Sequence, residues 1–267
     1  MKDIDSKKIE DIIRHVAATE VMPRWRNLQK HDIREKGPGD LVTVADEASE
    51  KVFTKLLAEA LPGSLVVGEE AVAKDRSVLE RLKGDQPVWV IDPIDGTYNF
   101  SHGKEKFGIL ISLIQHGATQ YGWAFDAAGN RMAIAQRGAG AFLNGERLRR
   151  PACTATSLSQ LCGRGGGTGK LPPSTFREIY NQRCSLHDFM DFITGATDFI
   201  THTPKVTPWD HAACCLLAEE AGGYVAMNET EIPYDPTLHG PAMLLVAPDK
   251  EWWHKLFPVL HPQARRA

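Results

Sequence analysis

The sequence has no segment long and apolar enough to cross a membrane, and it has no strong net charge. A spanning helix needs roughly 18 to 20 apolar residues, and the longest apolar runs, such as 109–111 and 243–247, are far shorter. The 31 basic and 34 acidic residues among 267 give a formal charge of −3. Neither a nucleic acid nor a membrane is therefore predicted as a partner, and an anionic substrate would need a local source of positive charge.

Cysteine is scarce and is not arranged for crosslinks or for zinc. The five cysteines, at 153, 162, 184, 214 and 215, are odd in number and include no C-x-x-C pair. We therefore expect neither a disulfide framework nor a thiolate zinc site, and a reducing cytoplasm suits the chain best. The adjacent pair Cys214-Cys215 lies in an apolar helical pattern and is interpreted as core. The N-terminal residues also lack the apolar stretch of a signal peptide.

Several familiar phosphate-binding and hydrolase motifs are missing. In the glycine-rich segment 163–174, Lys170 is followed by Leu171, where a P-loop needs serine or threonine. Asp92 and Asp95 are three positions apart, whereas phosphatases with an aspartyl nucleophile need a D-x-D spacing. There is also no H-E-x-x-H, EF-hand loop or G-x-S-x-G elbow. These absences exclude P-loop nucleotide chemistry, a zincin site and a serine-nucleophile hydrolase.

The spacing of apolar residues changes along the chain from helical to strand-like and then alternates. Apolar positions recur at helical spacing over the first 30 residues and again from 46 to 60. The middle of the chain is typical of strands, several of them consecutive in an antiparallel meander, at 65–67, 88–91, 108–115, 121–125 and 132–135. Beyond a loop predicted at 163–174, strands and helices alternate, and Gly222-Gly223 ends a helix over 210–221.

This order of elements predicts a layered α/β or α+β fold. A chain of 267 residues suits one large domain. We therefore expect a single domain over 1–267, with two sub-lobes at approximately 1–162 and 163–267 that share one body.

The most informative stretch is 89–100, with the sequence W-V-I-D-P-I-D-G-T-Y-N-F. An apolar strand ends at Asp92, and Asp95-Gly96-Thr97 then turns the chain. Two carboxylates at the end of one buried strand would repel each other unless a cation lay between them. The stretch can supply oxygen ligands for Mg²⁺ and, if the turn opens a helix, amides for a phosphate. A purely structural turn is the alternative.

Acids from three other segments could join this pair. Glu69 follows an apolar strand, Asp210 opens a predicted helix, and Asp46 begins the second helix. Each acid also has a structural alternative. Glu69 and Glu70 could belong to a solvated loop. Asp210 could be an N-cap, and Asp46 could be the acid of a capping box with Thr43. Carboxylates from separate segments are nevertheless what a site for several metal ions would use.

Four segments together resemble the inositol monophosphatase family. D-P-I-D-G-T-Y-N-F at 92–100 matches the first signature of the family, and W-D-H-A-A at 209–213, running into E-A-G-G at 220–223, resembles the second. G-E-E at 68–70 and L-V-T-V-A-D at 41–46 resemble its two other acidic motifs. The four occur in family order, and the resemblance covers most of the chain.

The resemblance implies the αβαβα sandwich of the inositol monophosphatase and fructose-1,6-bisphosphatase-like sugar phosphatases. It also implies a phosphoric monoester hydrolase, two to three Mg²⁺ ions per active site, and a homodimer. The first metal would be bound by Glu69, Asp92 and the Ile94 carbonyl. The second would be bound by Asp92, Asp95 and Asp210. Glu69 would hold a third, weaker metal through water.

The resemblance further implies how the substrate would be held and attacked. The substrate would contact Ile94, Asp95, Gly96, Thr97 and Asp210, with the Gly96 and Thr97 amides on the phosphate. Metal-activated water, assisted by Glu69 and Thr97, would attack phosphorus in line without a covalent phosphoenzyme. Asp46 would accept a hydrogen bond from Thr97, and the loop that contains Lys36 would close over the site.

One segment departs from the pattern of the animal enzymes. Residues 201–207, T-H-T-P-K-V-T, contain no acid where those enzymes carry a glutamate that contacts a sugar hydroxyl, and the segment is one residue longer. We expect a small phosphorylated polyol or sugar as substrate, first of all inositol 1-phosphate. Histidinol phosphate, a sugar bisphosphate and a 3′-phosphonucleotide are alternatives. A regulatory binding protein that keeps the fold is an alternative of another class, against which the intact acid set argues.

Overall fold

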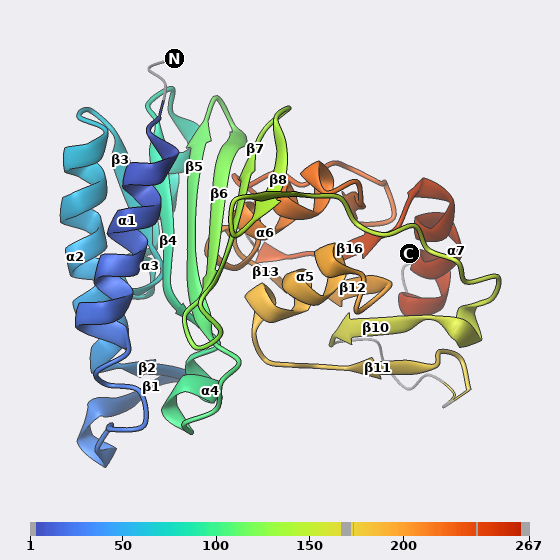
Figure 1. Cartoon of the computed structure of the whole chain (residues 1–267), viewed down its shortest axis with the longest axis horizontal. Helices are drawn as coiled ribbons and strands as arrows, with labels where there is room; N and C mark the ends of the chain where they lie inside the picture. The colour runs from blue at the N-terminus through green and yellow to red at the C-terminus, as the bar shows by residue number, and fades with distance from the viewer. Residues whose placement is uncertain (1–3, 167–171, 173, 239, 263–267) are drawn as a thin grey trace.

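The computed structural model describes residues 4–166, 172, 174–238 and 240–262. Its elements form five layers in the order helix, sheet, helix, sheet, helix (Figure 1). The predicted layered αβαβα sandwich is therefore confirmed. None of the described helices is both long and apolar enough to cross a membrane.

The larger sheet contains seven strands in the order β3-β4-β5-β6-β7-β8-β9. They span Leu65–Gly68 (β3), Val88–Asp95 (β4), Gly108–Gln115 (β5), Ala118–Asp126 (β6), Arg131–Gln136 (β7), Gly140–Leu143 (β8) and Glu146–Leu148 (β9). β3 and β4 are parallel, and the pairs from β4 to β9 are antiparallel, which confirms the meander. Every residue of β4 is buried, because layers cover both faces of the sheet, and this explains its unbroken apolar run.

Two helices cover the outer face of this sheet (Figure 1). They are α1 (Ser6–Val16) and α2 (Val44–Ala60). α1 continues as one π-helical turn, Ala17–Val21, and ends before Pro23, so only the first part of the helical spacing over the first 30 residues forms a helix. A proline ring clashes with the preceding turn and offers no backbone N–H, so the helix ends there despite apolar residues beyond it.

The middle layer consists of α5 (Ser185–Thr194) and α6 (Pro208–Glu220), which lie between the two sheets (Figure 1). Their buried side chains, together with those of both sheets, form one core that includes Cys214 and Cys215. The interpretation of this cysteine pair as core is therefore confirmed. Because α6 packs on the larger sheet through this core, the first turn of α6 is held close to the end of β4.

The smaller sheet has the order β11-β10-β12-β16-β14, and α7 (Lys250–Leu260) covers its outer face. Its strands span Cys162–Gly165 (β10), Glu178–Tyr180 (β11), Phe199–His202 (β12), Tyr224–Met227 (β14) and Leu244–Ala247 (β16). Short elements complete the chain around the end of β4: β1 (Ile33–Gly37), β2 (Asp40–Thr43), α3 (Glu69–Lys74), α4 (Thr97–Ser101), β13 (Lys205–Val206) and β15 (Gly240–Pro241).

The loop predicted at 163–174 is wrong at its beginning, where β10 forms a buried strand. A β-carbon on Gly163 would lie 2.3 Å from the ring of Phe199 on the neighbouring strand β12. Gly163 is therefore required because the Phe199 ring packs directly against its backbone. A glycine in a strand often marks such a close approach, so it does not by itself indicate a flexible loop. Residues 167–171 and 173 of the predicted loop lie outside the described residues.

Candidate active site

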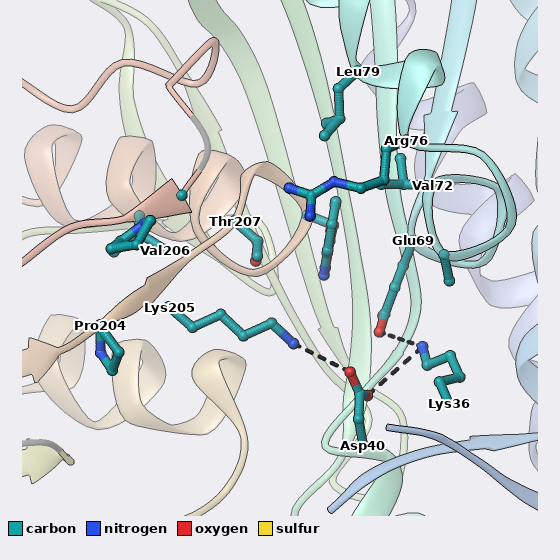
Figure 2. Close-up of a pocket in the computed structure, with 14 residues that line it drawn as sticks. Lys36, Asp40, Glu69, Val72, Arg76, Leu79, Pro204, Lys205, Val206 and Thr207 are labelled. Atoms are coloured by element: carbon teal, nitrogen blue, oxygen red, sulfur yellow. Dashed lines mark hydrogen bonds and ion pairs between the residues drawn. The ribbon is translucent and has the colours of Figure 1, made fainter. Parts of the chain in front are cut away.

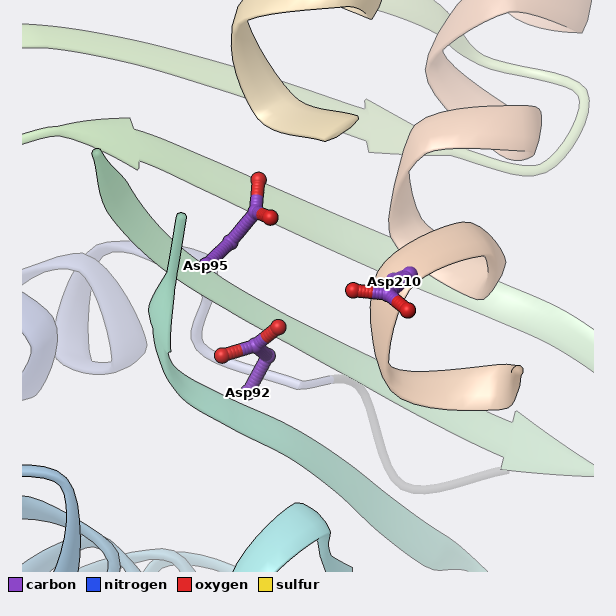
Figure 3. Close-up of side chains that lie close together, drawn as sticks. All are labelled: Asp92, Asp95 and Asp210. Carbon is purple, nitrogen blue, oxygen red and sulfur yellow. The ribbon is translucent and has the colours of Figure 1, made fainter. Parts of the chain in front are cut away.

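Three aspartates from two elements converge at the end of β4. Asp92 and Asp95 leave β4, Asp210 leaves the first turn of α6, and their carboxylates point into a common space (Figure 3). One carboxylate oxygen from each lies within 4.8 Å of the other two. Asp92 pairs with Leu110 of β5, and Asp95 pairs with Gly108. Between these two pairs, β4 has one more residue than β5, which is a β-bulge. Such a bulge lets side chains three positions apart point to the same side of a strand.

Asp92 and Asp95 lie in an environment that disfavours their charge. Asp92 is 1% exposed and Asp95 is 4% exposed. Burial, followed by the charges of Glu69, Asp95 and Asp210, raises the pKa of Asp92 well above its usual range. Burial and Asp210 raise the pKa of Asp95 to about 7. A buried set of carboxylate oxygens that repel one another is the donor set that a hard divalent cation such as Mg²⁺ fits.

Asp95 is held by the start of α5, a contact that the sequence did not reveal. Its carboxylate accepts hydrogen bonds from the amides of Ser185, at 3.1 Å, and Leu186, at 2.5 Å. The Cys184 thiol donates to the same carboxylate at 3.1 Å. Residues 184–186 are 89 or more positions from Asp95, so only the packing of α5 against β4 could bring them together. The orientation of the Asp95 carboxylate is therefore set by the middle helical layer.

Glu69 and Glu70 begin α3, and both bind Lys36 from the β1–β2 hairpin; Figure 2 shows the contact between Lys36 and Glu69. The Lys36 Nζ lies 2.8 Å from Glu69 Oε1 and 2.9 Å from Glu70 Oε1. Burial opposes the charge of Lys36, but the two glutamates outweigh it and raise the pKa of this lysine. Burial also disfavours the charge of Glu69 and raises its pKa to about 8, although the nearby charge of Lys36 acts in the opposite direction. The solvated-loop alternative is wrong, because both glutamate side chains are largely buried.

Asp46 has both of the roles that the sequence left open. It completes a capping box with Thr43, whose backbone N–H donates to Asp46 Oδ2 at 2.8 Å. Its other oxygen lies 3.3 Å from the Thr97 hydroxyl, which also lies 3.0 Å from the Ile94 carbonyl oxygen. Burial raises the pKa of Asp46 to about 7, despite the hydrogen bonds from Thr43. Asp46 therefore links the start of α2 to the turn after β4.

Gly96 makes the turn between β4 and α4 in a left-handed conformation, with φ of 81°. A β-carbon there would lie 2.9 Å from the Lys106 carbonyl oxygen and 3.1 Å from Cys184 Cβ. Both the backbone angle and the crowding require glycine. The turn places Gly96 and Thr97 in the wall of the same cavity as Asp92 and Asp210.

A cavity of about 490 Å³ opens over the acids and brings together most of the residues predicted from the sequence. Glu69, Asp92, Ile94, Gly96, Thr97 and Asp210 line it, together with Tyr98, Asn181, Arg183 and Lys205. Asp95 faces an adjoining cavity of about 470 Å³, which shares Asn181, Arg183, Lys205 and Asp210. A third cavity, of about 480 Å³, shares Asp40, Glu69 and Lys205 (Figure 2). Sequence reasoning assigned no role to Tyr98 within the 92–100 stretch, and it missed Asn181, Arg183 and Lys205, since none of these three belongs to an acidic motif.

Asp210 is not an N-cap, because Thr207 occupies that position and α6 begins at Pro208. Asp210 is instead the third residue of the helix, and the Thr207 hydroxyl donates to its carboxylate at 2.5 Å. A proline at the first helical position is favourable, since its missing N–H would have no partner there. The second oxygen of Asp210 is free of this bond and faces Asp92 and Asp95 (Figure 3).

Segment 201–207, which differs in sequence from the animal enzymes, takes part in a chain of hydrogen bonds between largely buried side chains. His202 Nε2 lies 3.1 Å from Asp188 Oδ2, and His202 Nδ1 lies 2.8 Å from His211 Nε2. His211 Nδ1 lies within hydrogen-bond distance of the Thr207 backbone. Burial, then His202, lowers the pKa of His211 to about 4. Both ring nitrogens of His202 are thus used inside the protein.

We expect the metal-free protein to lose stability as pH rises from about 4 to about 8. The folded-state pKa values of Asp46 and Asp95, about 7, and of Glu69, about 8, exceed their ordinary values of 3.8 and 4.5. Folded protein therefore binds more protons than unfolded protein in this window, so the free energy of unfolding falls with rising pH. Above about pH 8 most of the loss that these three groups cause has occurred.

Thermal unfolding in excess chelator at pH 5 and pH 8 tests this expectation. Mg²⁺ should raise the melting temperature more at pH 8 than at pH 5, because it binds the ionised carboxylates. Burial also raises the pKa of Glu50 to about 7. Because Glu50 is outside the metal-binding cluster, it makes the free energy of unfolding fall with rising pH whether or not metal is bound. A chelated protein that is more stable at pH 8 than at pH 5 would contradict this account of the acid cluster.

Comparisons with known proteins identify relatives over nearly the whole chain. The model of the inositol monophosphatase family matches residues 7–260. A fructose-1,6-bisphosphatase/inositol-1-monophosphatase of Thermotoga maritima is 31% identical over 212 residues, covering 77% of this chain and 78% of that protein. An inositol-1-monophosphatase of Bacillus subtilis is 31% identical over 206 residues, covering 73% and 75%.

Solved structures show the same fold at lower identity. The Thermotoga maritima IMPase superimposes with a TM-score of 0.80 at 24% identity and covers 100% of this chain and 99% of its own. Inositol monophosphatase II of Staphylococcus aureus gives a TM-score of 0.77 at 24% identity, with coverage of 97% and 94%. These likenesses extend from the larger sheet through the helical layer to the smaller sheet.

Proposed function

The chain belongs to the inositol monophosphatase family, a family of metal-dependent phosphatases, and from this premise we propose that it hydrolyses inositol 1-phosphate and similar small phosphate monoesters with Mg²⁺. The observation that carries the proposal is the convergence of Asp92, Asp95 and Asp210 within 4.8 Å. The cavity above them also contains Glu69 and the Gly96-Thr97 turn.

The donor set supports a site for two metal ions, with a third held more weakly. Glu69, Asp92 and the Ile94 carbonyl would bind the first, and Asp92, Asp95 and Asp210 would bind the second. Bound cations would lower the pKa of water and stabilise charge on the attacking and leaving oxygens. Glu69 forms an ion pair with Lys36 at 2.8 Å in this structure. Binding of the first metal ion would therefore replace this ion pair with a bond from Glu69 to the metal.

The residues of the chain position the reactants. The backbone amides of Gly96 and Thr97 would hold the phosphate, in the turn that Gly96 makes possible. Glu69 and Thr97 would orient the attacking water, and Asp46 would fix the Thr97 hydroxyl by accepting its hydrogen bond. No side chain has to become phosphorylated in this scheme, so one displacement by water completes the reaction.

Phosphate release from a panel of small monoesters, measured with and without Mg²⁺, tests the proposal. A regulatory binding protein with the same fold would bind but not turn over these esters. Mg²⁺-dependent turnover of any of them supports the hydrolase, and its absence across the panel would favour the binding protein. The proposed homodimer is tested separately by light scattering.

Among esters with neutral leaving groups, we expect weak selectivity. Sugar hydroxyls are usually selected by buried polar partners, and no carboxylate is available here in segment 201–207. Both nitrogens of His202 are already bonded. The kcat/KM values for inositol 1-phosphate and glycerol 2-phosphate should therefore lie within about tenfold, or about 1.4 kcal/mol.

Introducing an acid at Thr203 checks this explanation. Thr203 lines the cavity of about 470 Å³, and its replacement leaves the bonds of His202 in place. Thr203→Glu should favour inositol 1-phosphate over glycerol 2-phosphate, whereas the neutral control Thr203→Gln should not. A wild-type preference of a thousandfold for inositol 1-phosphate would show that its hydroxyls are recognised elsewhere.

A further inference from the structure

Arg183 stands at the mouth of the site in an unusual backbone conformation. Its φ of 56° is left-handed, which few residues other than glycine adopt. Its guanidinium lies over the ring of Tyr98, 4.2 Å from the centroid, and Tyr98 directly follows Thr97 in the proposed phosphate turn. None of the ion pairs within the described ranges includes Arg183. An exposed cation is thus held beside the phosphate position without an acid to neutralise it.

Both neighbours of Arg183 are fixed by buried hydrogen bonds. The Gln182 side chain donates to Asp188 at 3.1 Å and to Asp191 at 3.0 Å, and the backbone carbonyl of Gln182 accepts from the Asn99 side chain at 2.9 Å. On the other side, Cys184 donates to Asp95. The strained backbone is therefore held by the structure around it, as is usual where strain serves a site.

Lys205 offers a second cation to the same space. It lies on β13, and its Nζ is 3.4 Å from Asp40 Oδ2 (Figure 2). Although burial opposes its charge, Asp40, Asp210 and Glu69 raise the pKa of Lys205, so it remains an ammonium. Arg183 and Lys205 both line the cavity above the acids and the adjoining cavity of about 470 Å³.

The acid deepest in the adjoining cavity is not free to bind a hydroxyl. Asp188 is 1% exposed. One of its carboxylate oxygens accepts a hydrogen bond from Gln182, and the other lies 3.1 Å from His202 Nε2. Asp95 and Asp210 in the same wall are assigned to a cation. Two positive charges face this space: Arg183, which has no acidic partner among the described residues, and Lys205, whose charge is shared with Asp40 at 3.4 Å.

We infer that the substrate carries a second anionic group on its leaving group, a carboxylate or a second phosphate, and that Arg183 and Lys205 bind it. The inference rests on the proposed phosphatase function and narrows its substrate class. Guanidinium forms paired hydrogen bonds with carboxylates and phosphates, so Arg183 is the main specificity determinant. Neutral polyol phosphates are then substrates of lower efficiency.

Matched substrate pairs test this inference on the full-length protein with Mg²⁺. 2-Phosphoglycerate differs from glycerol 2-phosphate by a carboxylate in place of a hydroxymethyl group. Fructose 1,6-bisphosphate differs from fructose 1-phosphate by a second phosphate. In at least one pair, the anionic member should have a kcat/KM at least about tenfold higher, and the pair that shows it identifies the anion. This ratio should fall as ionic strength rises.

The variant Arg183→Gln should bring that ratio close to one, and Arg183→Lys should retain part of it. Lys205→Gln should lower the ratio independently. Arg149→Gln is the matched control, because Arg149 is exposed and follows β9 at the far edge of the larger sheet, and it should not alter the ratio. Melting curves confirm that each variant is folded.

Two results overturn the inference in distinguishable ways. If both members of each pair are hydrolysed equally and Arg183→Gln changes nothing, the second anionic site does not exist although the phosphatase does. If no member of either pair is hydrolysed with Mg²⁺, the proposed function fails and the inference fails with it.

Discussion

Replacing Asp92 with asparagine is expected to lower kcat by at least about a thousandfold, as when a central electrostatic group of an active site is removed. Asp92 is the acid proposed to bind both metal ions, and it lies with Asp95 and Asp210 in the cluster. The amide keeps the shape of the side chain but removes its charge. Its oxygen can still accept the hydrogen bond from the Ile94 amide, now 3.0 Å long.

The same substitution should not destabilise the metal-free protein. Burial and four neighbouring acids disfavour the charge of Asp92, so the melting temperature in chelator should hold or rise at pH 8. Asp85→Asn, at an exposed turn before β4, is the matched control and should change neither kcat nor melting temperature. Near-normal turnover by Asp92→Asn would show that Asp92 is only a structural residue of the turn.

Removing divalent metal is expected to abolish hydrolysis, and adding Mg²⁺ in excess of the chelator should restore it. Six acids gather near the site, and they would repel a phosphate in the absence of cations: Asp46, Glu69, Glu70, Asp92, Asp95 and Asp210. Lys36 neutralises only part of this charge, through Glu69 and Glu70. Phosphate release should be followed before chelation, after chelation and after restoration of Mg²⁺.

An inactive chelated enzyme must be distinguished from an unfolded one. Circular dichroism of the chelated sample should still show the folded protein, because the cores on either side of the larger sheet do not include the acids. Full activity in excess chelator would contradict the metal-dependent mechanism.

The acidic motifs and the order of elements were predictable because they depend on local chemistry. Apolar runs of strand length mark β4 and the meander, and Asp92, Asp95 and Gly96 come directly after the apolar run 88–91. The acid in the first turn of α6 was also visible, and only the alternative that it caps the helix is wrong, because Thr207 occupies that position. A sequence shows which polar residue is near a helix start, but the helix start itself can move by one or two residues.

The contacts that complete the site come from segments far apart in the chain. Arg183 and Lys205 carry no motif, and Cys184 through Leu186 reach Asp95 only because α5 packs between the two sheets. The engagement of both His202 nitrogens depends in the same way on α5 and α6, which supply Asp188 and His211.

The sequence by itself determined the layered fold, the family and the four acidic segments of the site. These depend on periodicity, turn residues and residue type, which act over a few positions of the chain. Only the tertiary structure decided which groups neutralise one another and which remain free for a substrate. Burial and distance set those charges, and both arise when β4, α5 and α6 pack together. That packing leaves Arg183 exposed, with no acidic partner among the residues that the structure describes, while it closes the hydrogen bonds of Asp188 and His202.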